Sequence, residues 1–369
     1  MDSFFFCFFA KIIKNKIEVM DIRVTPAEKS RVQEVNMQNV PFGKYFTDHM
    51  LICNYSNGAW GVPEIKPFQP LTLSPSNAAI HYGQSIFEGI KAYRHQDGSC
   101  HIFRPYDNYK RFNQSAERLQ MPEVPEDIFI EGMKKLIDLD RNWIPGFADH
   151  SLYIRPFMFA TDETIGVKPS ESYLFMIILS PTGPYYAAPM RIYVEEHFVR
   201  AVPGGIGFAK AAGNYAAAMY ATAEAKKKGF DQVLWMDAIE HKYVQECGTM
   251  NVFFIFDGEA VTPDLKEGTI LAGVTRDSVM QVLRDMGLKV SERPISIDEI
   301  LQAYNHGTLK EVFGTGTAAT ISLIRELGYK ETRMEFEVEK WTIAPEIKDR
   351  MSGIREGKLP DTKNWLLEI

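Results

Sequence analysis

The stretch "GFAKAAGNYAAAMYATAEAKKKG" occupies residues 207–229 and predicts a loop that leads into a helix. Asn214 is a favoured N-cap residue, and the lysines at 226–228 followed by Gly229 are typical of a helix end. Lys210 precedes the predicted helix among small residues, without an acidic neighbour in the sequence. It is either an exposed loop lysine or an amine that desolvation makes nucleophilic, able to form a Schiff base.

Length and composition limit the class of protein. The chain has 369 residues, of which 45% are hydrophobic and 24% charged, and its formal net charge is -7. This length favours two domains, and the negative charge argues against nucleic-acid binding and against a polybasic membrane surface. The four cysteines form no CxxC pair and show no metal-ligand spacing, so we expect a cytoplasmic protein without a structural metal or disulfides.

The N-terminus "MDSFFFCFFAKIIKNKIEVM" opens with an aromatic run but contains no basic leader region and no small-residue cleavage site. Its apolar part is too short to span a bilayer. We interpret residues 1–19 as a disordered extension or as sequence upstream of a true start at Met20. The alternative is a targeting segment or a membrane-touching arm.

The pattern of elements predicts an α+β fold with a small domain at 20–180, a linker at 181–189 and a larger domain at 190–369. The stretch "SPTGPYYAAP" (180–189) contains three prolines and indicates the linker. Expected strands are 49–55, 89–94, 99–103, 151–159, 172–179, 232–237, 251–261, 289–295 and 309–321. Expected helices are 108–119, 126–140, 214–228 and 275–287, capped by Thr275, and one that begins with the capping box of Ser296 and Glu299.

Two further residues accompany the lysine. Tyr215 follows it in "GNY" and offers a phenol, and Glu246 in "QECGTMNVFF" precedes a glycine turn that enters an apolar strand. Glu246 either caps that turn or holds a cationic ring nitrogen. A pyridoxal phosphate site needs a lysine, a phenol near the ring oxygen, an acid at the pyridine nitrogen and a group of phosphate-binding donors.

Two segments are candidates for phosphate binding. "AGVTRD" (272–277) places Val274 and Thr275 at a helix N-terminus, where free N–H groups and the helix dipole favour an anion. "GTGTA" (314–318) is a glycine-rich turn with threonine hydroxyls. The stretch "GGIGFAKAAG" lacks the spacing of a P-loop, and no dinucleotide fingerprint is present, so the sequence supports no nucleotide site.

Taken together, the motifs resemble those of the branched-chain amino-acid aminotransferases, which are pyridoxal phosphate enzymes of fold type IV. The similarity covers about residues 30–360 and rests on "HYGQSIFEGIKAYR", "FRPYDNYKRF", "YIRPF", "AKAAGNY", "ECGTMN", "AGVTR" and "FGTGTAA", which occur in the family's order. The resemblance implies two domains with the cofactor at their interface.

The resemblance also assigns roles to single residues. Lys210 would form the imine with pyridoxal 5'-phosphate and carry protons, Tyr215 would bind the ring oxygen, and Glu246 would hold the ring nitrogen. The implied phosphate ligands are Arg111, Val274, Thr275 and Thr317, whereas Arg104 is expected to be structural. The implied substrate pocket consists of Tyr82, Phe87, Tyr153, Arg155, Thr249 and Ala318.

The implied activity is transfer of the amino group of L-leucine, L-isoleucine or L-valine to 2-oxoglutarate. Family members are at least homodimers, because part of each pocket comes from the partner's small domain. The mammalian redox CxxC is replaced here by Ala319 and Ser322, so thiol regulation of that kind is not expected. Alternatives within the fold are a D-amino-acid aminotransferase and an aminodeoxychorismate lyase, and a third is a non-catalytic cofactor-binding protein.

Overall fold

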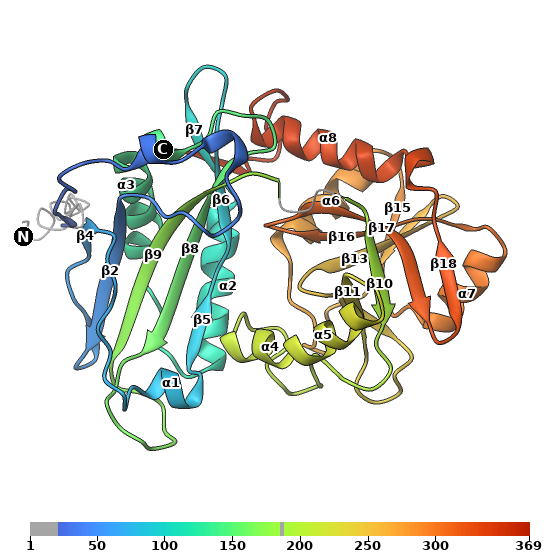
Figure 1. Cartoon of the computed structure of the whole chain (residues 1–369), viewed down its shortest axis with the longest axis horizontal. Coiled ribbons are helices and arrows are strands. Elements are labelled where there is room, and N and C mark those ends of the chain that lie inside the picture. Colours follow the sequence, from blue (N-terminus) through green and yellow to red (C-terminus); the bar gives the residue numbers. More distant parts are fainter. Residues whose placement is uncertain (1–20, 185–187) are drawn as a thin grey trace, which may run out of the picture.

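The strands of the protein form two β-sheets that lie side by side (Figure 1). The computed structural model describes residues 21–184 and 188–369, so the predicted extension at 1–19 lies outside the described residues. The helices are α1 (Ala78–Tyr82), α2 (Pro105–Arg118), α3 (Gly132–Leu139), α4 (Ala212–Ala217), α5 (Met219–Lys227), α6 (Val274–Asp285), α7 (Ile297–Asn305) and α8 (Ile343–Arg355). This architecture confirms the predicted α+β class.

Among the described residues, the first sheet has ten strands in the order β1-β4-β2-β9-β8-β6-β7-β19, with β3 paired to β2 and β5 paired to β8. Their bounds are β1 Arg23–Val24, β2 His49–Ser56, β3 Ala59–Trp60, β4 Glu64–Pro67, β5 Ser85–Phe87, β6 Ile90–Arg94, β7 Cys100–Phe103, β8 Ser151–Ala160, β9 Tyr173–Thr182 and β19 Leu366–Glu368.

The centre of this sheet is the antiparallel pair β8 and β9, which stays in register from Ser151↔Thr182 to Ala160↔Tyr173. Both strands are nearly continuous apolar runs, as expected for strands that other elements cover. Strand β9 includes Pro181 and Thr182, two residues beyond the boundary predicted from the prolines, because the start of β8 pairs with them.

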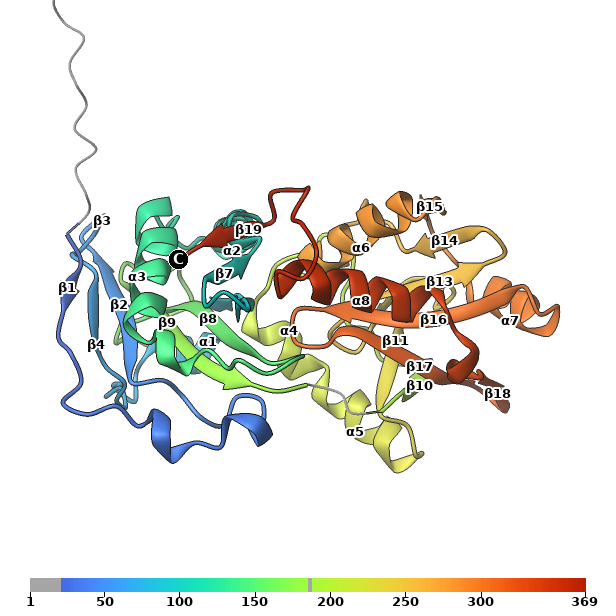
Figure 2. The same cartoon turned by 90° about the horizontal axis from the view of Figure 1, so that it is seen from above.

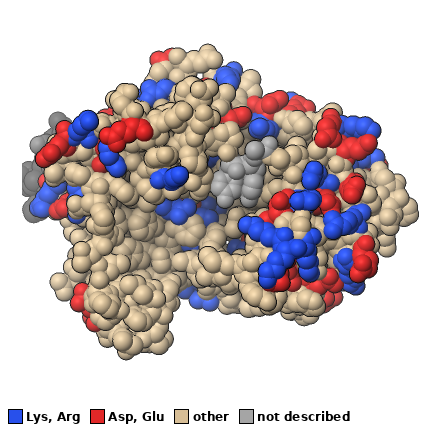
Figure 3. Space-filling view, viewed as in Figure 1, with Lys and Arg blue, Asp and Glu red and all other residues tan. Residues whose placement is uncertain are grey.

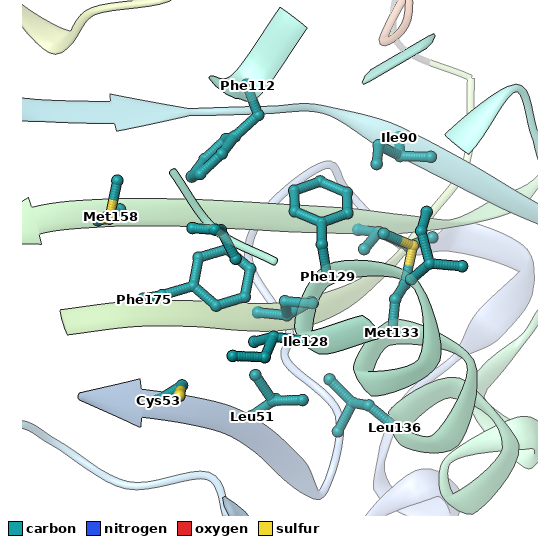
Figure 4. Packing of buried hydrophobic residues seen from close by; sticks show 14 of the residues in the cluster. Leu51, Cys53, Ile90, Phe112, Ile128, Phe129, Met133, Leu136, Met158 and Phe175 are labelled. Atoms are coloured by element: carbon teal, nitrogen blue, oxygen red, sulfur yellow. The ribbon is translucent and has the colours of Figure 1, made fainter. Parts of the chain in front are cut away.

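Helices α2 and α3 cover one face of the first sheet, where side chains from the helices meet side chains from the strands (Figure 4). Phe112 of α2 packs edge-on against Phe175 of β9, with ring centroids 5.6 Å apart. Helix α2 begins where Pro105 occupies the first turn, after Arg104 in a left-handed conformation (φ 49°). This packing fixes the helix that carries Arg111.

In the part of the chain that the structure describes, the second sheet has nine strands in the order β12-β11-β10-β17-β16-β13-β14-β15, with β18 paired to β17. Their bounds are β10 Met190–Val194, β11 Gln232–Met236, β12 Val244–Cys247, β13 Asn251–Phe256, β14 Glu259–Thr262, β15 Lys289–Glu292, β16 Leu309–Gly316, β17 Thr320–Tyr329 and β18 Thr332–Glu335.

Both faces of the second sheet are covered. Along β13, Val252 and Phe254 belong to the core shared with α7, whereas Phe253 and Ile255 belong to the core shared with α6 and α8. The alternation follows from the two-residue period of a strand. Burial on both faces explains why this segment is apolar without a break.

The end of the chain returns to the first sheet. Strand β19 pairs antiparallel with β7 through Leu366↔Phe103, Leu367↔Ile102 and Glu368↔His101, and it lies beside α2 and α3 (Figure 2). Trp365 packs edge-on against Phe103 with ring centroids 5.6 Å apart. The last residues of the predicted second domain therefore complete the sheet of the first.

Two of the predicted helix caps are wrong. The stretch 214–228 forms two helices, α4 and α5, and α4 already begins at Ala212, so Asn214 lies inside it. The Asn214 amide instead donates to the carbonyls of Ile206 and Ala209 in the preceding loop, at 2.9 Å each. Helix α6 begins at Val274 after Gly273, without a side-chain cap, so Thr275 lies in its first turn.

The capping box of α7 is confirmed, because the Ser296 side chain accepts a hydrogen bond from the Glu299 N–H. The remaining short helices are η1 (Val32–Glu34), η2 (Met37–Asn39), the π-helix η3 (Asp127–Glu131), η4 (Arg141–Trp143) and η5 (Val338–Lys340). Among the described helices, none has the length and apolarity to cross a bilayer. Residues 21–184 and 188–369 contain no cluster of three metal-ligating side chains.

Candidate active site

A cavity of about 260 Å³ lies between the two sheets. In the space-filling view the surface is hollowed between the two halves of the molecule, and basic side chains are visible inside the hollow (Figure 3). Of the thirteen residues predicted for the site, all except Tyr82 line this cavity: Phe87, Arg111, Tyr153, Arg155, Lys210, Tyr215, Glu246, Thr249, Val274, Thr275, Thr317 and Ala318.

Lys210 is held by its backbone against the first sheet. Its N–H donates to the Ser115 hydroxyl of α2 at 2.9 Å, and its carbonyl accepts the Phe87 N–H at 3.1 Å. The Lys210 Nζ donates to the Tyr215 hydroxyl at 2.8 Å and lies 4.9 Å from the centre of the Phe87 ring. The amine therefore points into the cavity with a phenol, and not a carboxylate, as its hydrogen-bond partner.

Glu246 is buried at the end of β12, where its carboxylate has three protein partners. Oε2 lies 2.6 Å from Nε of Arg200, and Oε1 accepts the Leu271 N–H at 3.1 Å and Asn251 Nδ2 at 3.2 Å. Burial raises the pKa of the Glu246 carboxyl, and the Arg200 guanidinium and the Leu271 N–H oppose that rise. The carboxylate is thus fixed in place and lines the cavity.

Arg111 projects from the buried face of α2 and forms a two-pronged ion pair with Glu88. Its Nε and Nη2 donate to the two Glu88 oxygens at 2.7 and 2.8 Å, and Nη1 donates to the Ala272 carbonyl at 2.8 Å. Full burial acts to raise the pKa of the Glu88 carboxyl, but the charge and hydrogen bonds of Arg111 outweigh it and hold that pKa below its usual value. An arginine has five N–H donors, so one on each Nη remains for an anion in the cavity.

The N-terminus of α6 opens into the same cavity, through Val274 and Thr275. A Cβ on Gly273 would lie 2.0 Å from Oδ1 of Asn251, so only glycine fits where the chain enters the helix. Arg104 holds this helix to α2 through Asp277 and Ser278, at 2.6 and 2.8 Å. Arg104 does not line the cavity and makes these interhelical contacts, in agreement with the structural role predicted for it.

Aromatic and basic side chains of the first sheet form the opposite wall. Arg155 lies with its guanidinium carbon 4.6 Å from the centre of the Phe87 ring and donates from Nη2 to the Tyr153 hydroxyl at 2.9 Å. A Cβ on Gly89 would lie 2.3 Å from that hydroxyl, so any larger residue at position 89 would clash with the Tyr153 side chain. This wall combines apolar rings with one cation.

The glycine-rich turn after β16 closes the cavity, with Thr317 and Ala318 in its lining. The Ala318 carbonyl accepts a hydrogen bond from Nζ of Lys91 at 3.0 Å. Lys91 belongs to β6 of the first sheet, so this bond joins the two sheets at the site. Thr249, from the loop between β12 and β13, lies on the same cavity.

Tyr82 is the one predicted residue that lies elsewhere. It ends helix α1, its side chain is 41% exposed, and its ring lies beside that of His81 at 6.1 Å. The sequence motif "HYGQSIFEG" did not show this, because Tyr82 is the last residue of a five-residue helix and the left-handed Gly83 turns the chain before β5 begins.

The donors in the cavity fit pyridoxal phosphate. The Thr315 hydroxyl is buried there and has no hydrogen-bond partner among the described residues, which leaves it free for a ligand. A lysine amine, a phenol, a buried carboxylate and arginine N–H groups surround one space. These are the groups that such a cofactor requires.

Comparison with known proteins identifies the family. The model of the family "Amino-transferase class IV" matches residues 85–327. The chain belongs to the class IV aminotransferases. This aminotransferase is 48% identical to the "Branched-chain-amino-acid transaminase 1" of Bacillus subtilis (strain 168) over 334 residues, 89% of this chain and 94% of that protein. The "Branched-chain-amino-acid aminotransferase 2" of the same strain is 47% identical over 333 residues, 89% of this chain and 92% of that protein.

Solved structures agree with this aminotransferase in fold. A branched-chain amino acid aminotransferase from Escherichia coli superposes with a TM-score of 0.69 at 26% identity, covering 87% of this chain and 98% of that chain. The branched-chain amino acid aminotransferase of T.th., solved with pyridoxamine 5'-phosphate, gives 0.69 at 28% identity, over 85% and 97% of the two chains.

Three residues of this aminotransferase were not predicted from the sequence. Arg200, Glu88 and Asn251 are buried or nearly so, and each holds a predicted site residue or its neighbour. Glu88 stands inside the motif "HYGQSIFEG", which was a usable signal. Asn251 likewise stands inside the motif "ECGTMN", whereas Arg200 belongs to none of the quoted motifs and its partner Glu246 lies far along the chain.

Proposed function

We propose that this aminotransferase transfers the amino group of L-leucine, L-isoleucine or L-valine to 2-oxoglutarate, giving the branched 2-oxo acid and L-glutamate. The observation that carries the proposal is the convergence of Lys210, Tyr215 and Glu246 on one cavity. The choice of substrate class is supported by two relatives named as branched-chain aminotransferases or transaminases, which are 48% and 47% identical to this chain over 89% of its length.

The cofactor contacts follow from the donor groups. Glu246 would accept a hydrogen bond from the ring nitrogen, and Tyr215 would bind the ring oxygen. The phosphate would be held by Arg111, by the first-turn N–H groups of Val274 and Thr275, and by the Thr317 hydroxyl. Bound pyridoxal phosphate supplies the electrophilic carbon that receives the amino group and the ring that withdraws electrons from the substrate.

Proton transfer falls to Lys210. Its Nζ, held beside the Tyr215 hydroxyl at 2.8 Å, removes the proton from the substrate Cα in one direction and returns it in the other. The amine acts as a base only when neutral, and its hydrogen-bond partner among the described residues is the Tyr215 hydroxyl. The same residue thus serves both half-reactions.

Two kinds of side chain must enter one pocket, a branched aliphatic chain and that of glutamate. The rings of Phe87 and Tyr153 offer apolar contact to the former. Arg155 lies between these rings and offers N–H groups to the second carboxylate. The turn at Ala318 offers a backbone N–H to the α-carboxylate, which both substrates share.

The working form that we propose is a cytoplasmic homodimer. Tyr82 lies in the first sheet's half of the molecule but outside its own cavity, as expected if it contributes to the pocket of a second copy. Cys53, Cys100 and Cys247 are buried free thiols, which a reducing compartment maintains.

The test is the visible absorption spectrum of the purified protein before and after L-leucine is added without any 2-oxo acid. We expect a yellow protein whose band bleaches, followed by recovery when 2-oxoglutarate is added. D-alanine should leave the band unchanged.

A yellow protein that responds to D-alanine and not to L-leucine would move the assignment to a D-amino-acid aminotransferase. One that bleaches with neither would favour a lyase of the same fold. A protein that stays colourless with added pyridoxal phosphate would contradict the proposal altogether.

A further inference from the structure

The carboxylate of Glu246 has four acceptor positions, and the structure fills three of them. An ionised carboxylate offers about two lone-pair directions on each oxygen. Oε1 receives the Leu271 N–H and Asn251 Nδ2, so both of its directions are used. Among the described residues, Oε2 receives only Arg200 Nε, at 2.6 Å. The one acceptor left for a group in the cavity is therefore on Oε2, the oxygen that Arg200 also contacts.

The other donors of Arg200 are committed to the backbone. Nη1 donates to the Thr269 carbonyl at 2.8 Å, and Nη2 donates to the Gly207 carbonyl at 3.2 Å. Thr269 precedes the loop that enters α6, and Gly207 precedes Lys210 by three residues. One buried guanidinium thus touches the lysine loop, the loop to the phosphate-binding helix and the acid at the ring nitrogen.

Charge explains why the acid needs this partner. Glu246 is buried, so desolvation favours its neutral form, and Arg200 is the nearest group that opposes this effect; Lys210 and Arg111 act in the same sense from farther away. A neutral acid would offer its own proton to the ring nitrogen in place of an acceptor. The ring would then lose the positive charge that withdraws electrons from the substrate.

We propose that Arg200 is a positioning residue that keeps Glu246 ionised and turns the free acceptor of Oε2 toward the cavity, so that the ring nitrogen keeps its proton. The inference rests on the proposed role of Glu246. It assigns to Arg200 a part in the chemistry in addition to its contacts with the two loops.

The experiment compares two cofactors on the full-length protein. One is pyridoxal phosphate and the other is its deaza analogue, which has a C–H group in place of the ring nitrogen. Dissociation constants of both are measured by fluorescence after removal of the bound cofactor. The wild-type protein should prefer pyridoxal phosphate by about tenfold or more, the scale of one charge-assisted hydrogen bond.

In Arg200→Gln we expect this preference to fall to about twofold or less, because the ring nitrogen loses its anionic acceptor. Glu246→Gln should give the same low ratio, and the double variant should fall no further. Arg200→Lys keeps a cation beside Glu246 but is too short to bind both carbonyls, so it should restore most of the preference. Arg94→Gln is the matched control, because Arg94 binds the carbonyls of Arg141 and Ile144 away from the cavity.

The outcomes separate the roles. A Gln variant that weakens both cofactors equally, with the ratio intact, would show that Arg200 only holds the loops and would overturn the inference. The same holds if Arg200→Lys behaves like Arg200→Gln with both compounds. A wild-type protein that binds neither compound would contradict the proposed function itself, and one that binds both equally would contradict the role of Glu246.

Discussion

Lys210 is fixed by its backbone before its side chain makes any contact. The Lys210 N–H donates to the Ser115 hydroxyl and the Lys210 carbonyl accepts the Phe87 N–H, and Ala211 forms a β-bridge with Ile86. The Cα of Lys210 therefore keeps its position when the partner of Nζ changes, which suits the imine role that we propose for this residue.

Lys210→Ala tests the central residue. We expect turnover of L-leucine with 2-oxoglutarate to fall by about 10²- to 10⁴-fold or more, because proton transfer loses its base. The fold should survive, since the anchoring bonds of residue 210 come from its backbone. Coupled assay and circular dichroism are the measurements. Lys226→Ala, at an exposed lysine in the last turn of α5, should keep full rates; near-normal rates in the Lys210 variant would refute the assignment.

Arg155→Met tests how the pocket admits a second carboxylate. Loss of charged hydrogen bonds costs about 1.5–3 kcal/mol, so KM for 2-oxoglutarate should rise by about 10- to 100-fold. KM for L-leucine should change far less, because the rings of Phe87 and Tyr153 remain. Steady-state kinetics with each substrate varied decide the matter. Arg284→Met, at an exposed position of α6, is the control. An equal rise in KM for both substrates would mean that Arg155 shapes the pocket and does not bind the second carboxylate.

At the residue scale the sequence was informative where side chains point into the cavity. Lys210, Tyr215 and Glu246 were predicted because their chemistry, order and neighbouring turns form a recognisable set. Arg200 was not predicted, since its importance depends on a contact at 2.6 Å with Glu246, which lies far along the chain on β12. A buried arginine has no local signature that separates it from an exposed one.

At the scale of elements, the site is built where loops approach one another closely. Gly207 is the clearest case: a Cβ there would lie 2.5 Å from the Ala201 Cβ and 2.5 Å from the Thr269 carbonyl oxygen. Strand positions were predictable from alternation and apolar runs, as in β13. The start of α4 was not predictable. An N-cap side chain accepts from N–H groups of the helix, but the Asn214 amide donates to carbonyls of the preceding loop.

Gly207→Ala should therefore lower the free energy of unfolding by about 1–3 kcal/mol, the usual cost of overpacking, and weaken cofactor binding because the Lys210 loop shifts. Gly213→Ala is the matched control, since a Cβ at 213 meets nothing within 4 Å. That variant should be unchanged or more stable by up to about 1 kcal/mol. Chemical denaturation of both proteins is the measurement, and equal stabilities would show that the loop at 207 adapts freely.

At the scale of the whole molecule, Lys91 joins the two sheets by its bond to the Ala318 carbonyl at 3.0 Å. Burial lowers the pKa of the Lys91 amine to about 7, and nearby Arg355 acts in the same direction. Between pH 7 and the ordinary value of 10.5, the unfolded chain holds a proton that the folded chain has released. Stability contributed by this group therefore rises with pH across that window.

Lys91→Met removes this dependence. The melting temperature of the variant, compared with that of the wild type, should be highest near pH 6.5. This difference in melting temperature should shrink as the pH rises toward 10. Melting temperatures of both proteins over this range are the measurement, with Lys226→Met as an exposed control. A constant difference between wild type and Lys91→Met would mean that the amine stays charged in the folded protein.

In its connectivity, the second sheet is an insertion into the first. The chain leaves the first sheet after β9, builds all nine strands of the second, and returns through β19 to pair with β7. Trp365 and the Arg104–Trp365 backbone bond at 2.7 Å secure that return. One cut in the backbone between β9 and β10 would consequently leave two fragments that are still joined by the β7–β19 strand pair. A fragment expressed from residue 190 onward would contain β19 but would lack β7, the strand with which β19 pairs.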